Sequence, residues 1–84
     1  MAFTFGVQLR AARALARLEQ EELAARSGVS VVTIRTLENS EGPVNARTRT
    51  LRALEEALAT AGIVFTNGDE PGVKMRRKPA TNAA

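Results

Sequence analysis

Apolar residues recur every three or four positions in two long stretches of the chain, which is the spacing of one face of an amphipathic α-helix. The first stretch predicts a helix that Thr4 caps and that runs to about Arg17. The second predicts a helix that begins at Asn45 or Thr48 and ends before Gly62, a typical C-terminal glycine. The apolar positions that define the two faces are Leu9, Ala12, Leu15 and Ala16 in the first helix and Leu51, Leu54, Leu58 and Ala61 in the second.

Two shorter helices between them are predicted to meet at a tight turn. Gly28 stands at the turn, where a positive φ angle is easiest for a residue without a Cβ. Ser30 follows and is a good N-cap, because its hydroxyl can accept an otherwise unpaired backbone N–H. The residues predicted to face inward are Leu23, Ala24, Ile34 and Leu37, and Val29 is predicted to fill the apolar space at the turn. This arrangement is a helix-turn-helix, a motif that places its second helix in the DNA major groove.

The pattern changes from helical to alternating after Gly62. The segments I-V-F-T and V-K-M-R alternate like strands, and the turn-forming segment N-G-D-E-P-G separates them. They predict either a short β-hairpin or two strands that pair across a dimer. The expected fold is mostly α: a four-helix helix-turn-helix domain over residues 1–62, a C-terminal β-hairpin or dimer-forming strands over 63–76, and a disordered tail over 77–84.

Composition excludes several classes of function. The chain has 84 residues, enough for one small domain, and it contains no cysteine and no histidine. Disulfides, thiolate chemistry and the usual zinc and imidazole sites are excluded, so we expect no metal and no cofactor. The glycines are scattered and form no phosphate-binding loop. Adjacent acidic residues such as Glu21 and Glu22 diverge by roughly 100° on a helix and form no acid–base pair, which argues against an enzyme.

Charge and hydropathy indicate the expected location. The formal net charge of +3 is too mild to indicate nucleic-acid binding by itself. No apolar run approaches the roughly 20 residues of a membrane span, and the N-terminus M-A-F-T-F-G lacks the basic start of a secretory signal. We therefore expect a cytoplasmic protein with no membrane partner. A core of this size is marginal, so self-association would be a natural supplement.

A set of residues at fixed spacing extends the helix-turn-helix pattern. The set comprises Gln20, Leu23, Ala24, Gly28, Val29, Ile34 and Leu37, together with the distant pair Arg13 and Glu38. On these residues the chain resembles the phage-repressor (Xre/Cro) family of DNA-binding domains, over roughly residues 7 to 62. The resemblance implies a Cro/repressor-like fold and an ion pair between Arg13 and Glu38. The alternative is two separate surface charges. The chain departs from the family at Arg17, where Gly is frequent, and at Glu19, where Ser or Thr is usual.

The recognition helix leaves several residues unassigned to the core, and these are the predicted base readers. They are Val31, Val32, Thr33, Arg35 and Thr36. The two valines match family positions that commonly face bases, so contact with thymine methyl groups is preferred over packing beneath a neighbouring segment. Arg35 is the strong polar reader and suits guanine, with a phosphate contact or a solvated charge as the alternative. Thr33 and Thr36 can bond a phosphate or a base edge. Specificity would therefore depend largely on methyl contacts and DNA shape.

Phosphate contacts are predicted on both sides of that helix. Gln20 begins the second helix, where its side chain and nearby backbone N–H groups can hold a phosphate oxygen. Asn39, Arg47 and Arg49 follow the recognition helix, in a region that matches the second backbone clamp of the family. Ordinary surface charge is the alternative for the two arginines.

The alternating segments after Gly62 are predicted to build a dimer surface. Its residues would be Ile63, Phe65, Val73 and Met75. Exposed strand edges invite pairing with a second chain, and an isolated hairpin is marginal in water. In the alternative, the hairpin folds over its own domain, and a dimer forms through the fourth helix or not at all.

These expectations describe a small sequence-specific transcriptional regulator, a repressor or controller that inserts residues 30–39 into the major groove as a dimer on a palindromic operator. The expected partners are double-stranded DNA, a second copy of the chain, and RNA polymerase or another regulator. No small-molecule ligand is expected. The alternative is a protein-interaction module, an antiactivator or an antitoxin, that uses the same fold.

Overall fold

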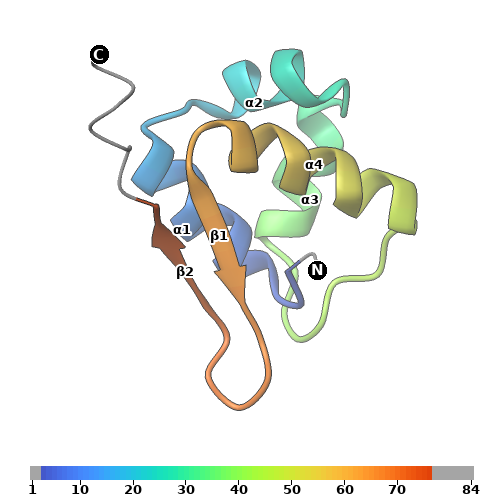
Figure 1. The fold of residues 1–84 in the computed structure, drawn as a ribbon. Coiled ribbons are helices and arrows are strands. Elements are labelled where there is room, and N and C mark those ends of the chain that lie inside the picture. The colour runs from blue at the N-terminus through green and yellow to red at the C-terminus, as the bar shows by residue number, and fades with distance from the viewer. Residues whose placement is uncertain (1–2, 77–84) are drawn as a thin grey trace, which may run out of the picture.

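The computed structural model describes residues 3–76, and its elements pack around one core (Figure 1). The helices are α1 (Gly6–Ala16), α2 (Gln20–Ser27), α3 (Val31–Glu38) and α4 (Thr48–Thr60), and the strands are β1 (Ile63–Thr66) and β2 (Gly72–Met75). The predicted fold class, mostly α with a C-terminal hairpin, is confirmed. The tail predicted over residues 77–84 lies outside the described residues.

The turn between α2 and α3 has the geometry that the sequence predicts. Gly28 adopts a φ of 77°, and its N–H donates to the carbonyl oxygen of Ala24 at 2.9 Å, which closes the last turn of α2. Ser30 then caps α3, because its Oγ accepts the backbone N–H of Thr33 at 3.1 Å. These two local features fix the relative direction of α2 and α3.

The start of α1 differs from the prediction that Thr4 caps it. Phe5 occupies the N-cap position, and the side chain of Gln8 accepts hydrogen bonds from backbone N–H groups at this end of the helix. Its Oε1 accepts the backbone N–H groups of Thr4 and Phe5 at 2.8 and 2.9 Å. The next residue, Gly6, has no room for a side chain, because a Cβ at this position would collide with the carbonyl oxygen of Leu37. The backbones of α1 and α3 therefore approach one another closely.

Every helix contributes to the core. The largest fully buried side chains are Leu9 of α1, Leu23 of α2, Ile34 of α3, and Leu54 and Leu58 of α4. These are the inward positions that helical spacing predicts, and Thr48 is confirmed as the first residue of α4. None of the described helices is long and apolar enough to cross a membrane.

The hairpin lies against α1 and α4 (Figure 1). Its strands are antiparallel, with Ile63 opposite Met75 and Phe65 opposite Val73. Gln8 of α1 binds the hairpin where the two strands meet the loop. Its Nε2 donates to the carbonyl oxygens of Thr66 at 2.8 Å and Gly72 at 3.1 Å. The hairpin is thus a part of the domain.

This packing corrects the prediction that all four alternating apolar residues form a dimer surface. Ile63 is 2% exposed and Phe65 is 9% exposed, and the ring of Phe65 lies 5.2 Å from the ring of Phe3. Both side chains complete the core of their own chain and are unavailable to a partner. Val73 is half-buried and Met75 is exposed, so only the second strand retains apolar surface for another contact.

Candidate nucleic-acid interface

The outward face of α3 lies opposite its buried stripe. Ile34 and Leu37 face the core, whereas Val32, Arg35 and Thr36 are exposed. Val32 has 63% of its surface open to solvent, so it does not pack beneath a neighbouring segment of the described chain. The face therefore presents a branched alkyl group, a guanidinium and a hydroxyl side by side.

Val31 and Thr33 flank this face and are half-buried. Each is one residue from Val32 and so points about 100° away from it around the helix. Thr33 is also part of the cap, since its hydroxyl accepts a hydrogen bond from the Ser30 hydroxyl at 2.9 Å. The structure thus divides the predicted base readers into an outward group and a flanking pair.

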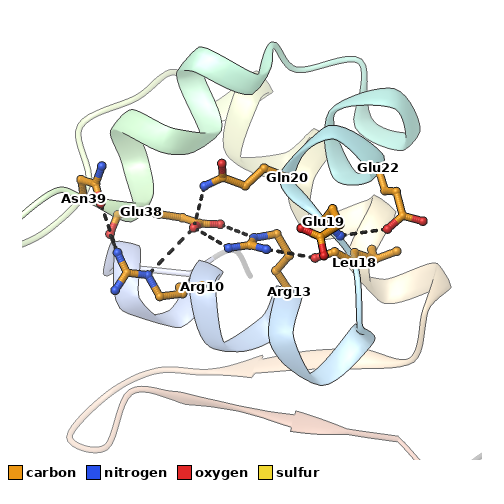
Figure 2. Close-up of polar contacts among 8 residues, drawn as sticks. All are labelled: Arg10, Arg13, Leu18, Glu19, Gln20, Glu22, Glu38 and Asn39. Atoms are coloured by element: carbon orange, nitrogen blue, oxygen red, sulfur yellow. Dashed lines mark hydrogen bonds and ion pairs between the residues drawn. The ribbon is translucent and has the colours of Figure 1, made fainter.

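Glu38 ends α3 and is buried, although it carries a charge. Arg13 of α1 donates to both carboxylate oxygens, from Nε to Oε2 at 2.8 Å and from Nη2 to Oε1 at 3.0 Å (Figure 2). Its Nη1 also donates to the carbonyl oxygen of Leu18 at 3.0 Å. The hydrogen bond with Glu38 raises the pKa of Arg13, although burial acts in the opposite direction. The two side chains paired in the sequence analysis meet here and join α1 to the end of α3.

Gln20 reaches the same carboxylate from the first residue of α2. Its Nε2 donates to Oε1 of Glu38 at 3.1 Å, so that side chains from α1 and α2 converge on the end of α3 (Figure 2). An amide nitrogen has two N–H groups, and the second can still donate to a phosphate oxygen. The predicted phosphate ligand is therefore oriented by the ion pair.

Arg10 is a further functional candidate, for which the sequence pattern predicts no role. Its Nη2 donates to Oδ1 of Asn39 at 3.1 Å, and its Nε lies 4.0 Å from Oε1 of Glu38 (Figure 2). The same Nη2 also donates to the carbonyl oxygen of Glu38 at 3.4 Å. Because Asn39 accepts through its amide oxygen, its amide nitrogen remains the donor group for a phosphate. The signal that could have found Arg10 is its place one helical turn before Arg13, on the side of α1 that faces the end of α3.

Arg47 and Arg49 lie at the start of α4 and are exposed. Arg47 holds the N-cap position, and no side chain among the described residues caps the helix by a hydrogen bond there. Arg49 lines a shallow depression with Thr33 and the turn that joins α2 to α3. The structure thus brings Arg49 to the Thr33 side of the recognition helix and places Arg47 at the preceding turn.

The sequence matches the family model of the helix-turn-helix domain over residues 4–63, which is most of the chain. The chain belongs to this helix-turn-helix domain family. The matched region covers all four helices and ends at the first residue of β1. No curated protein matches the sequence.

Within this helix-turn-helix domain, α2 and α3 form the motif itself, and α3 is the helix that such a motif presents to the major groove. The side chains on its outward face can make alkyl contacts, bidentate hydrogen bonds and single hydrogen bonds. Two oriented amides, Gln20 of α2 and Asn39, lie at the C-terminal end of α3. The arrangement is therefore an outward helix face of mixed alkyl and polar groups, with two oriented amides beside its C-terminal end.

Proposed function

We propose that this helix-turn-helix domain is a sequence-specific DNA-binding transcriptional regulator of the phage-repressor (Xre/Cro) type. The observation that carries the proposal is the outward face of α3, where Val32 stands exposed beside Arg35 and Thr36. A single exposed valine is ordinary on a protein surface. Here it lies on a helix whose C-terminal end is held to α1 by the ion pair of Glu38 and Arg13, so the backbone that carries the three side chains is fixed in the domain.

Each outward residue suits a particular base edge in the major groove. Val32 fits the C5-methyl group of thymine, which apolar side chains contact. Arg35 fits guanine, whose O6 and N7 accept two parallel hydrogen bonds from a guanidinium. Thr36 suits either a base edge or a phosphate. The flanking residues Val31 and Thr33 would contact the sides of the groove.

Phosphate binding would come from groups that surround this face. Gln20 and Asn39 each have an amide N–H available beyond the bond that orients their side chain. Arg47 and Arg49 add two positive charges at the N-terminus of α4, where backbone N–H groups and the helix dipole favour an anion. These contacts fix register and carry no sequence information themselves.

The regulator would act as a dimer on a palindromic operator, because two recognition helices separated by about 34–36 Å match one turn of DNA. A protein bound across a promoter can block RNA polymerase, so a repressor or controller is the expected role. Polymerase or another regulator would then be the remaining partner.

The proposal is tested by selecting bound sequences from a random DNA pool with the wild-type chain and with Arg35→Ala. The wild type should enrich a motif that contains a fixed guanine, and the variant should lose the preference at that position alone. Arg26→Ala, which removes an exposed arginine from α2, is the matched control and should retain the motif. Enrichment of no motif by a folded wild-type chain would overturn the proposal.

A second candidate, an antiactivator or antitoxin module, is favoured by the exposure of Val32, since the same side chain suits a protein partner. The two functions differ in their response to salt. DNA affinity should fall with a log–log slope of about −0.9 for each neutralised phosphate, whereas a valine-centred protein contact should change little.

A further inference from the structure

The recognition helix α3 divides along its length into two turns of different chemistry. Its first turn carries two valines, of which Val32 is 63% exposed and Val31 is half-buried. Its second turn carries the polar side chains of Arg35 and Thr36, both of which are exposed. A base that faces the first turn therefore meets alkyl groups, whereas a base that faces the second turn meets hydrogen-bonding groups.

The hydroxyl groups beside the first turn are engaged in the helix cap. Oγ of Ser30 accepts the backbone N–H of Thr33 at 3.1 Å and donates to the hydroxyl of Thr33 at 2.9 Å. A hydroxyl group has one proton, so Ser30 has none left to donate to a base. Thr33 is half-buried, lines the depression that contains Arg49, and points roughly 100° away from Val32 around the helix. The alkyl group of Val32 is therefore what the outward side of this turn offers to a base.

The polar side chains of the second turn begin too far along the helix to share the base that Val32 contacts. An α-helix rises about 1.5 Å per residue, so Arg35 lies about 4.5 Å and Thr36 about 6 Å beyond Val32 along the axis. Successive base pairs are about 3.4 Å apart. With α3 lying along the groove, Arg35 and Thr36 therefore face neighbouring base pairs.

Two pyrimidines of DNA present a methyl group at the same place in the major groove. Thymine carries its C5-methyl group beside the O4 acceptor, whereas cytosine carries a hydrogen atom at C5 beside the N4 donor. 5-Methylcytosine combines the methyl group of thymine with the N4 donor of cytosine. A hydrogen-bonding side chain is needed to distinguish O4 from N4, but an alkyl side chain distinguishes a methyl group from a hydrogen atom.

We propose that Val32 recognises the C5-methyl group itself, so that 5-methylcytosine can take the place of thymine at one position of the operator half-site. The ligand class is duplex DNA with a C5-methylated pyrimidine, and both sources of the methyl group suit the first turn. This inference rests on the proposed sequence-specific DNA binding and adds the chemical group that this turn reads.

The proposal gives the domain a response to the chemical state of its DNA. A half-site with cytosine at this position would bind weakly, because it offers Val32 no methyl group. Methylation of that cytosine would strengthen binding without any change in base sequence. Occupancy of such an operator would then depend on DNA methylation as well as on protein concentration.

Binding to four duplexes that differ at one base pair tests this inference. The position is the one at which uracil in place of thymine weakens binding of the wild type but not of Val32→Ala. In one half-site it is filled in turn with thymine, uracil, 5-methylcytosine and cytosine. Fluorescence anisotropy then gives the dissociation constant of each duplex. The comparisons of thymine with uracil and of 5-methylcytosine with cytosine isolate the methyl group from the identity of the base pair.

Both comparisons should show the same effect. Loss of the methyl group should weaken binding by about fourfold in each, which corresponds to about 0.8 kcal/mol. An affinity for 5-methylcytosine no higher than that for cytosine overturns the proposal, because the methyl group is then read only within thymine. The proposal is equally overturned if uracil can replace every thymine of the operator without loss.

Two controls separate recognition by Val32 from other effects of methylation. Val32→Ala should remove most of both methyl effects, whereas Val7→Ala, which truncates a valine of equal exposure on α1, should leave both unchanged. 5-Methylcytosine placed outside the half-sites should not alter the affinity, which excludes a general effect of methylation on DNA shape. Methyl effects that persist in Val32→Ala overturn the assignment to Val32.

The experiment also distinguishes failure of this inference from failure of the proposed function. A folded chain that selects no DNA motif contradicts both. A chain that selects a motif through Arg35 but binds methylated and unmethylated pyrimidines alike contradicts this inference alone.

Discussion

Two surfaces of this helix-turn-helix domain expose aliphatic side chains, and they differ in what surrounds them. On α3, Val32 lies beside Arg35 and Thr36. On α1 and β2, Leu15 and Met75 lie beside alanines and an unpaired strand edge. The first surface combines alkyl and hydrogen-bonding groups, which a base edge requires. The second offers alkyl groups and backbone hydrogen bonds, which another strand requires.

The difference arises from how α1 is used. Gln8 and Arg13 are directed to the hairpin and to the end of α3, and of the polar residues of α1 Arg10 alone is exposed to solvent. The helix that fixes the recognition surface therefore acquires an apolar surface of its own. In a domain this small, one helix positions α3 and exposes apolar side chains on its other side.

The largest effect on stability should come from breaking the ion pair between Arg13 and Glu38, which joins α1 to the end of α3. Glu38→Ala leaves Arg13 without its carboxylate, and breaking one half of such a pair costs about 3–5 kcal/mol. We expect the lower end of that range, because Arg13 retains some solvent access and its bond to Leu18. Urea unfolding measures the loss. Glu41→Ala, at an exposed loop position, is the control and should change stability by less than about 0.5 kcal/mol.

Comparison of Arg35→Ala with Arg47→Ala should separate recognition of a DNA base from binding to the DNA phosphate backbone. Loss of a bidentate contact to guanine should cost about 1–3 kcal/mol of discrimination at one operator position. Arg47→Ala should instead weaken binding to all sequences alike and reduce the salt slope by about 0.9. Titrations against matched operator and single-base variants distinguish the two. Equal losses of specificity in both variants would contradict the assignment of Arg35 to a base.

Arg17→Gly should alter stability without altering either surface. Arg17 closes α1 with a φ of 58°, a left-handed conformation that disfavours side chains with a Cβ. Glycine at this position should raise the free energy of unfolding by about 1 kcal/mol, since such a conformation costs roughly 1–2 kcal/mol and glycine adds some chain entropy. Thermal unfolding tests this, with DNA affinity and dimerisation expected to remain at wild-type values. A loss of stability would mean that the guanidinium of Arg17 makes a compensating contact.

Val32→Ala should have the smallest effect. Truncation removes two methyl groups from the outward face, of which one would be buried against a thymine methyl, and burial of one such group contributes about 0.8 kcal/mol. The loss should appear on an operator that contains thymine and disappear when uracil, which lacks the methyl group, replaces that thymine. An equal loss on both operators would show that Val32 contacts no thymine methyl.

Local features of the fold could be predicted from the sequence because their causes are local. Gly28 permits the turn, Ser30 caps α3, and the apolar spacing of α4 fixes its buried face. The pairing of Arg13 with Glu38 joins residues that are distant in the sequence. It was implied by resemblance to a family, and no periodicity could have revealed it.

The features that sequence could not predict depend on what lies across a tertiary contact. Alternation identified Ile63 and Phe65 as the apolar side of a strand, but it could not say whether their own core or a partner covers them. Thr4 is a good cap by residue type, yet the side chain of Gln8 takes that place because it also reaches the hairpin. Arg10 gained a role only once α3 was positioned beside α1.

The measurement that tests the central claim most directly is footprinting of the wild type and Arg35→Ala on the DNA upstream of its own gene, with excess nonspecific competitor. The wild type should protect two half-sites about one helical turn apart, and the variant should lose or relax that protection. Absence of protection by a folded wild-type chain, or protection that Arg35→Ala leaves unchanged, would contradict base reading by α3.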